Sequence, residues 1–344
     1  MRTFIIGDIH GCYDELMQLL RQINIQPEDL LISVGDIVDR GPKSLETWQF
    51  FRDRPNSIVL MGNHERKHLN GILSYAQEIV RVQFGADYPA FVAWTQTLPY
   101  YYETPEAIVV HAAFEHDQSL AQQREDVLCG ATAGDRYLQS RYASGTSWSD
   151  YYQGQKPLVY GHHVVGDDAK YLHNTIGIDT GCCHGGLLTA LELPGFEMHQ
   201  LRAEKDYWRE QQQLWQIPVL QSKPWETMTF ENIHKQFEKL AYIQEPAVVA
   251  LIQNLRSWLE ALDQLLNELL QDLSAFARAL SEQHGPDFNR VAATYFFQAF
   301  LFKSKSDNLP IAELAKKLDT PEKRIVLADA LGIKNRAVLR SNYL

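Results

Sequence analysis

Long apolar runs and cysteines are scarce in this sequence of 344 residues. No stretch is long and apolar enough to span a bilayer, so a protein anchored by membrane-spanning helices is not expected. The N-terminus lacks the charged and apolar regions of a signal peptide. The four cysteines (Cys12, Cys129, Cys182 and Cys183) show neither zinc-type spacing nor a disulfide framework. We therefore expect a cytoplasmic protein with reduced thiols.

Basic side chains are also outnumbered, since 43 acidic and 32 basic residues give a formal net charge of −11 at pH 7. This balance argues against a protein that coats nucleic acid non-specifically. The sequence lacks a Gly-x-x-x-x-Gly-Lys-Ser/Thr loop, so a P-loop kinase domain is not expected. Hydrophobic residues make up 45% of the chain, which is enough to bury a sizeable core.

Three short polar motifs near the N-terminus each follow an apolar run that is typical of a β-strand. They read GDIHG (7–11), GDIVDRG (35–41) and GNHE (62–65). Each places carboxylate, imidazole or amide groups beside glycine at a strand end. These hard oxygen and nitrogen donors are the ligands that a two-metal hydrolytic centre requires. The pattern therefore predicts a metal centre at the ends of three strands.

Hydrolysis of a phosphate ester needs an activated water, neutralised phosphate oxygens and a proton for the leaving group. One carboxylate must bridge the two metals to fix their separation at about 3.5–4 Å, and Asp36 is the candidate bridge. Asp8 and His10 are expected to complete the first ligand set, and Asn63 is expected to bind the second metal through its amide oxygen. Two further histidines end apolar strands and are candidates for the second metal: His111 and His162.

Three other residues of the motifs are candidates for catalysis. His64 is expected to act as the general acid for the leaving oxygen, with Asp39 hydrogen-bonded to it. A carboxylate partner favours the imidazolium and fixes the orientation of the ring. Arg40 is expected to hold the phosphate in a bidentate contact that a lysine would make less well.

Strand-like and helix-like segments alternate over the first two hundred residues, which predicts α/β layering with a partly antiparallel sheet. We place this domain at 1–207, a linker at 208–229 and a helical domain at 230–344. A stripe of leucines predicts one long amphipathic helix from Pro246 to about Gly285. A second helix is predicted over 288–302, and shorter helices after Pro310 and Pro321.

Together the three motifs resemble the signature of the calcineurin-like (phosphoprotein-phosphatase-type) metallophosphoesterases. Downstream runs at 160–162, 178–182 and 185–191 resemble the phosphatase domain of bacterial polynucleotide kinase-phosphatase, and the similarity covers about 1–207. The resemblance implies an αββα sandwich and two divalent ions, usually manganese. It implies the metal ligands and catalytic residues assigned above, and it adds Asp179 as a functional aspartate near the metals.

The chain departs from these relatives at several places. It has His163 where many relatives have threonine after the last ligand histidine. Relatives of the polynucleotide type usually have an arginine three residues before the tryptophan that matches Trp148, and this chain has Gly145 there. The second phosphate contact is therefore open, with Arg141 as one possible substitute.

The preferred hypothesis is a metal-dependent phosphoesterase that hydrolyses phosphomonoesters, and cyclic phosphodiesters, on nucleic-acid or nucleotide ends. Alternatives within the same class are a symmetrical dinucleoside tetraphosphatase and a serine/threonine protein phosphatase. An alternative of another class is a vestigial metal domain that serves as a binding module. In that case the helical half would recruit a protein or nucleic acid. A protein partner, or self-association through these C-terminal helices, is open in either case.

Overall fold

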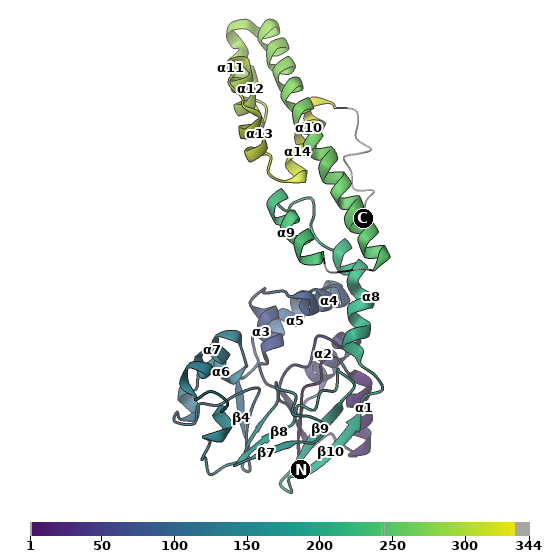
Figure 1. Ribbon diagram of the computed structural model, residues 1–344, viewed down its shortest axis with the longest axis vertical. Helices are drawn as coiled ribbons and strands as arrows, with labels where there is room; N and C mark the ends of the chain where they lie inside the picture. The colour runs from purple at the N-terminus through teal and green to yellow at the C-terminus, as the bar shows by residue number, and fades with distance from the viewer. Residues whose placement is uncertain (1, 242, 244, 334–344) are drawn as a thin grey trace. The chain divides into compact units, whose positions relative to one another are not determined.

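A computed structural model describes residues 2–241, 243 and 245–333. The chain divides into two compact units, Met1–Trp215 and Gln216–Leu344. Helix α8 (Tyr207–Gln221) crosses the division and occupies much of the segment that was predicted to be a linker (Figure 1). Pro218 lies inside this helix and has no N–H to donate to the carbonyl of Leu214, a residue that is 61% exposed.

The first sheet of the N-terminal unit is mixed. Its strand order is β10-β9-β1-β2-β3. Strands β1, β2 and β3 are parallel to one another, and β9 is antiparallel to both of its neighbours, β1 and β10. The strands are β1 (Thr3–Ile6), β2 (Leu30–Ser33), β3 (Ser57–Val59), β9 (Leu187–Leu193) and β10 (Glu197–Arg202). Helices α1 (Tyr13–Gln22) and α2 (Ser44–Asp53) contact this sheet. The expected mixture of parallel and antiparallel pairing is confirmed.

The second sheet has the order β4-β5-β6-β8-β7, and β5, β6 and β8 are parallel. Its strands are β4 (Tyr101–Glu103), β5 (Ile108–Val110), β6 (Leu158–Tyr160), β7 (Lys170–Leu172) and β8 (Thr175–Gly177). The other helices of this unit are α3 (Asn63–Leu69), α4 (Tyr75–Phe84), α5 (Tyr88–Thr95), α6 (Glu125–Leu128) and α7 (Thr132–Arg141).

The two sheets pack face to face. One buried cluster takes side chains from both sheets, among them Ile5 and Ile32 of the first and Val109, Val159 and Ile176 of the second. A second cluster joins the outer face of the first sheet to α1, α2, α4 and α5, and a third joins β5 and β6 to α6 and α7. The layered αββα sandwich is therefore confirmed, and it sets the parallel strand ends of both sheets around one site.

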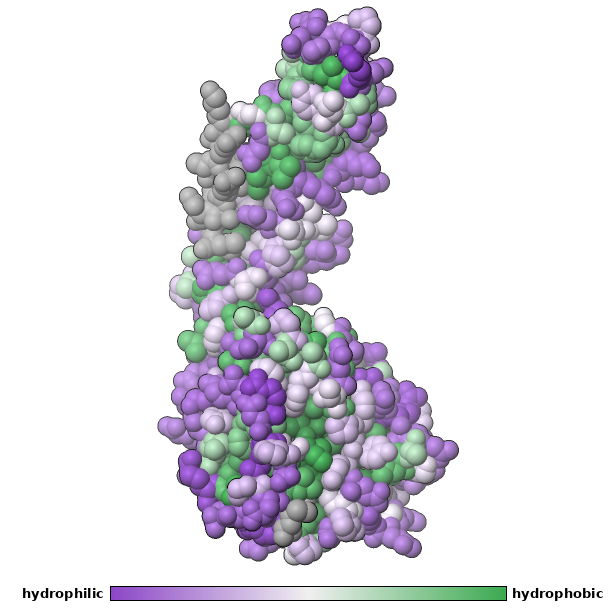
Figure 2. Space-filling view, turned by 180° about the vertical axis from the view of Figure 1, so that it is seen from behind, coloured by the Kyte–Doolittle hydropathy of each residue, from purple (hydrophilic) through white to green (hydrophobic). Residues whose placement is uncertain are grey.

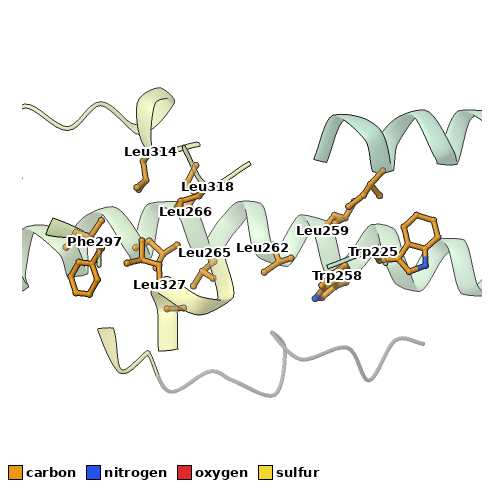
Figure 3. Close-up of a cluster of buried hydrophobic side chains, with 14 of the residues drawn as sticks. Trp225, Trp258, Leu259, Leu262, Leu265, Leu266, Phe297, Leu314, Leu318 and Leu327 are labelled. Atoms are coloured by element: carbon orange, nitrogen blue, oxygen red, sulfur yellow. The ribbon is translucent and has the colours of Figure 1, made fainter. Parts of the chain in front are cut away.

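The C-terminal unit is helical over its described residues. Its helices are α9 (Phe230–Leu240), α10 (Pro246–His284), α11 (Phe288–Ala292), α12 (Gln298–Lys305), α13 (Ile311–Lys317) and α14 (Pro321–Leu331). The core follows the predicted leucine stripe of α10: Leu265 lies near Leu327, Leu266 lies near Leu318, and Trp258 lies near Trp225 (Figure 3). The predicted long helix is confirmed, while residues 242, 244 and 334–344 of the predicted helical domain lie outside the described residues.

The single helix predicted over 288–302 is wrong, because the chain breaks between α11 and α12. Phe297 lies in this break and is 3% exposed, with its ring 5.8 Å from that of Phe276. Consecutive aromatic residues lose side-chain freedom in a helix, and burial of Phe297 in the core offsets the lost helical hydrogen bonds.

Apolar side chains are largely removed from the surface in both units. On the face shown in Figure 2, polar residues cover most of each unit and smaller apolar areas lie between them. Among the described residues, no helix combines the length and the apolarity that a bilayer crossing needs, including the 39-residue α10.

Candidate metal centre

The three motifs lie where β1, β2 and β3 end, at one edge of the first sheet. Parallel strands bring their carboxyl ends to the same edge, so Asp8, Asp36 and Asn63 are neighbours despite their separation in sequence. Backbone hydrogen bonds join the first two loops, since the amide of His10 donates to the carbonyl of Asp36 at 2.8 Å. The backbone of the sheet and its loops therefore brings the predicted ligands close together, independently of contacts between their side chains.

The backbone of this site is held in an unusual conformation. Nine non-glycine residues among those described have a positive φ, and five of them are predicted site residues: His10, Asp36, Asp39, Arg40 and His162. Such conformations cost free energy and persist only where surrounding contacts enforce them. Glycine is needed beside them, because a Cβ on Gly62 would lie 2.2 Å from the Asp36 Oδ1 and one on Gly161 would lie 2.1 Å from the Asp8 Oδ1.

Asp36 stands at the centre of the predicted ligands. Its Oδ2 lies 3.7 Å from the Nε2 of His10, 3.9 Å from that of His64 and 3.5 Å from that of His111. Two groups of potential metal ligands share this carboxylate: His10, Asp36 and His64 form one, and Asp36, His111 and His162 form the other. This is the arrangement expected of a bridging carboxylate.

Asn63 lies beside the two histidines predicted for the second metal. Its Oδ1 is 3.2 Å from the Nε2 of His111 and 3.0 Å from the Nδ1 of His162. The Nδ1 of His111 donates to the carbonyl of Val34 at 3.0 Å, which leaves the Nε2 as the acceptor, and burial lowers the pKa of this histidine. Two acceptor atoms that face each other fit a shared cation, so the donor set suits a metal ion.

The first ligand set is arranged in the same way. The Nδ1 of His10 donates to the carbonyl of Val38 at 2.9 Å, which leaves the Nε2 as the acceptor. Asp8 accepts the backbone amide of His162 at 3.0 Å, so it ties β1 to the loop after β6. Burial, and then the charges of Asp179 and Asp36, raise the pKa of Asp8 well above its usual range. Closely placed buried carboxylates favour a cation between them.

Asp179 lies at the same centre, as the resemblance implied. It is 5% exposed, and its Oδ1 accepts the backbone amide of Gly181 at 3.0 Å. Burial, together with the nearby charge of Asp36, raises the pKa of Asp179 to about 6. The sequence around Asp179 indicates only a strand-end residue, because no local motif distinguishes it.

His64 and Asp39 are paired as predicted. The Nδ1 of His64 lies 2.5 Å from the Oδ2 of Asp39, and Gln77 donates to the same oxygen. The other oxygen of Asp39 contacts the Nε2 of His68 at 3.0 Å, and the Nδ1 of His68 contacts the hydroxyl of Tyr88 at 3.0 Å. Although burial opposes it, the contacts with His68 and His64 hold the pKa of Asp39 far below its usual range.

Arg40 reaches the metal centre, whereas Arg141 does not serve as a free substitute for the missing arginine. The Nη1 of Arg40 donates to the Nε2 of His10 at 3.0 Å. Arg141 is bound by two carboxylates, with its Nη1 2.9 Å from Glu115 and its Nη2 2.6 Å from Asp117. A guanidinium held between two carboxylates is already neutralised, so the structure does not support Arg141 as a phosphate contact.

Sequence reasoning gave no role to His68, Glu65 or Gln77. Glu65 is fully buried and accepts the backbone amides of Asp36 and Ile37 at 2.9 Å each, so it holds the loop that carries the bridge. His68 is four residues after His64 on α3, which places both rings on one face of the helix. That spacing was a usable signal for His68, whereas Gln77 comes from α4 and only the packing reveals it.

Replacing His68 with asparagine is expected to lower kcat on an aryl phosphate by about 10-fold, because Asp39 loses one of its two imidazole partners and orients His64 less well. The pH profile of kcat should change as well, because Asp39 holds the proposed general acid. The rates are measured with His234→Asn as a control in the exposed part of α9. An unchanged profile with a lower melting temperature would reduce His68 to a structural role.

Comparison with known proteins gives a consistent result. The model of the family described as calcineurin-like phosphoesterase matches residues 1–252. An asymmetrical bis(5'-nucleosyl)-tetraphosphatase PrpE of Halalkalibacterium halodurans is 32% identical over 235 residues, which cover 57% of this chain and 92% of that relative. A symmetrical bis(5'-nucleosyl)-tetraphosphatase of Shewanella sediminis is 31% identical over 198 residues, with coverage of 53% and 72%. A solved metallophosphoesterase from Sphaerobacter thermophilus matches 62% of this chain and 94% of its own at 18% identity, with a TM-score of 0.39.

Proposed function

We propose that this chain, which belongs to the calcineurin-like phosphoesterase family, uses two divalent metal ions to hydrolyse a dinucleoside polyphosphate. The observation that carries the proposal is the position of Asp36 in both groups of potential ligands. Asp8 and His10 would hold one ion, Asn63 and the two strand-end histidines would hold the other, and Asp36 would bridge them. Such a pair, when bound, supplies an activated water and neutralises phosphate oxygens.

The chain's own residues account for the rest of the chemistry. The Nε2 of His64 lies 3.9 Å from the Oδ2 of Asp36, so this ring can donate a proton to a leaving group next to the proposed bridging carboxylate. Asp39 contacts the opposite nitrogen of that ring and fixes its orientation. Arg40 is positioned to donate to phosphate oxygens, since its guanidinium already reaches the Nε2 of His10.

The names of the relatives favour a dinucleoside tetraphosphate as the substrate, which was an alternative to nucleic-acid ends in the sequence analysis. Both relatives described above carry tetraphosphatase names, one asymmetrical and one symmetrical. We therefore rank this substrate first, ahead of phosphate ends of nucleic acids and phosphoproteins. Manganese is the first metal to test, with other divalent ions after it.

The complete set of candidate metal ligands argues against the competing proposal of a vestigial metal domain. Asp8, Asp36, Asn63, His111 and His162 are all present and converge on one place. A protein kept only for binding through its helical unit has no need of these buried carboxylates, which are costly without a cation. Failure of the purified full chain to take up any divalent metal would favour the binding module.

A substrate panel with added manganese tests the proposed function. It compares diadenosine tetraphosphate, oligonucleotides with phosphate ends and phosphoserine or phosphothreonine peptides at equal concentration, with the full chain. The highest kcat/KM is expected for diadenosine tetraphosphate. A clear preference for phosphopeptides or for phosphate-ended oligonucleotides would overturn the substrate assignment but leave the metal centre in place.

A further inference from the structure

We propose that Arg66 binds a second phosphate group of the substrate, next to the phosphate that the metals and Arg40 hold. The inference rests on the proposed function and narrows it, because it makes the protein selective for polyphosphate chains over simple phosphomonoesters. Neither the motifs nor the resemblance assigned any role to Arg66.

The position of Arg66 follows from that of two predicted metal ligands. It lies three residues after Asn63 on α3, so the two side chains share a face of the helix. Its Nη1 donates to the Sγ of Cys129 at 3.2 Å. The next residue, Gly130, packs so closely on His162 that a Cβ there would lie 2.7 Å from the Cε1 of that ring. Arg66 is therefore linked to the second ligand set in two ways: through Asn63 on the same helix, and through the Cys129–Gly130 segment that packs on His162.

The charge of Arg66 is not neutralised by the protein. Within the described part of the chain no carboxylate forms an ion pair with it, and its other close partner is the ring of Tyr100, 5.9 Å from the guanidinium. Asp126 is the acid that acts on it electrostatically, but both oxygens of Asp126 are held by Arg124 at 3.0 and 2.8 Å. The side chain is partly exposed. One of its five N–H donors is used in the contact with Cys129, so most remain open to a ligand.

Arg40 and Arg66 resemble each other in having a thiol as a neighbour. Arg40 contacts the thiol of Cys183 and Arg66 contacts the thiol of Cys129. Several arginines of the same unit are instead paired with carboxylates: Arg2 with Asp29, Arg52 with Asp53, Arg124 with Asp126, Arg141 with Glu115 and Asp117, and Arg202 with Asp167. A thiol orients a guanidinium without cancelling its charge, which suits an arginine that must remain available to an anion.

This arrangement determines the chemical class of the substrate. A phosphomonoester has a single phosphate, and the metals with Arg40 are sufficient to hold it. A polyphosphate chain has further anionic groups, and the one that extends from the second ligand set reaches the guanidinium of Arg66. A charge-assisted contact of this kind contributes about 1.5–3 kcal/mol, which corresponds to about 10- to 100-fold in affinity.

Calorimetric titration tests the proposal without depending on turnover. The manganese-loaded full chain is titrated with tripolyphosphate and with orthophosphate, at a fixed free metal concentration, for the wild type and for Arg66→Gln. We expect the Kd for tripolyphosphate to rise by about 10- to 100-fold in R66Q, while the Kd for orthophosphate changes by less than about 2-fold. Arg66→Lys should lie between the two, and Arg52→Gln is the matched control on α2.

Equal losses for both ligands, or no loss for either, would overturn the role of Arg66. The kinetic counterpart is a rise in KM for diadenosine tetraphosphate without a change for an aryl phosphate. A wild-type protein that fails to hydrolyse the tetraphosphate, yet binds tripolyphosphate through Arg66, would refute the proposed substrate and retain the second phosphate site. The two proposals therefore fail separately.

Discussion

Replacing Asp36 with asparagine is expected to lower kcat on an aryl phosphate by about 10³-fold or more, with the protein still folded. Metal ions contribute several kcal/mol to such reactions, and each 1.36 kcal/mol is a factor of about 10 in rate. Asparagine is a poor bridge because it has one oxygen and no charge. The loss should therefore appear in kcat and in the metal content measured by mass spectrometry, which falls from about two ions to one or fewer.

The fold should tolerate this change for a specific reason. The Oδ1 of Asp36 accepts the backbone amide of His64 at 3.0 Å, and the amide oxygen of asparagine can accept it equally. The substitution also removes one of the buried charges that raise the pKa values of Asp8 and Asp179, after burial itself. The metal-free variant should thus melt no lower than the metal-free wild type. Activity within about 10-fold of the wild type would refute the bridging role.

Replacing His64 with glutamine is expected to lower kcat by about 10²- to 10⁴-fold for substrates with a poor leaving group. The loss should shrink as the leaving group becomes more acidic, because a stable anion departs without a proton. A series of aryl and alkyl phosphates measures this effect as a steeper dependence of log kcat on the leaving-group pKa in the variant. His116→Gln, an exposed histidine of the same unit, is the control.

A uniform loss across the whole series would argue against the general acid. His64 Nε2 also lies in the group with His10 and Asp36, so a uniform loss accompanied by lower metal content would assign His64 to the metal instead. The leaving-group series and the metal analysis together separate these two roles. The proposed substrate has a phosphate leaving group, and His64 should therefore matter less for it than for an alkyl phosphate.

Most of the candidate site was predictable because it is locally encoded. Asp8, Asp36 and Asn63 each follow a short apolar strand and a glycine, so their chemistry and their place at a sheet edge can be read together. His111 and His162 were found by the same rule at the ends of β5 and β6. The prediction of these candidate metal ligands therefore depended on recognising strand ends, which a sequence displays directly.

The residues that support the site were not predictable in the same way. The contact of His68 with Asp39 depends on how α3 packs under the second loop, and the ion pairs of Arg141 depend on the distant Glu115 and Asp117. A single arginine in a sequence gives no sign of whether a carboxylate will neutralise it. The proposed role of Arg66 was not predictable either, because it depends on the lack of an ion pair with a carboxylate among the described residues.

The fold likewise has parts that could be predicted from the sequence and parts that could not. The leucine stripe of α10 has a period that identifies a helix, and its bounds were close to those observed. The break between α11 and α12 is set by burial of Phe297, which only tertiary packing decides. Strand order within each sheet was likewise beyond the sequence, since β9 and β10 return to pair beside β1 from far along the chain.

The left-handed backbone at His10, Asp36 and His162 has a consequence for how ions enter and leave. Hydrogen bonds from protein groups already fix these loops, so loading needs little rearrangement of the chain. Exchange of one divalent ion for another should then proceed from the folded state, at a rate governed by desolvation of the incoming ion. Which ion occupies the site in the cell would follow supply as much as affinity.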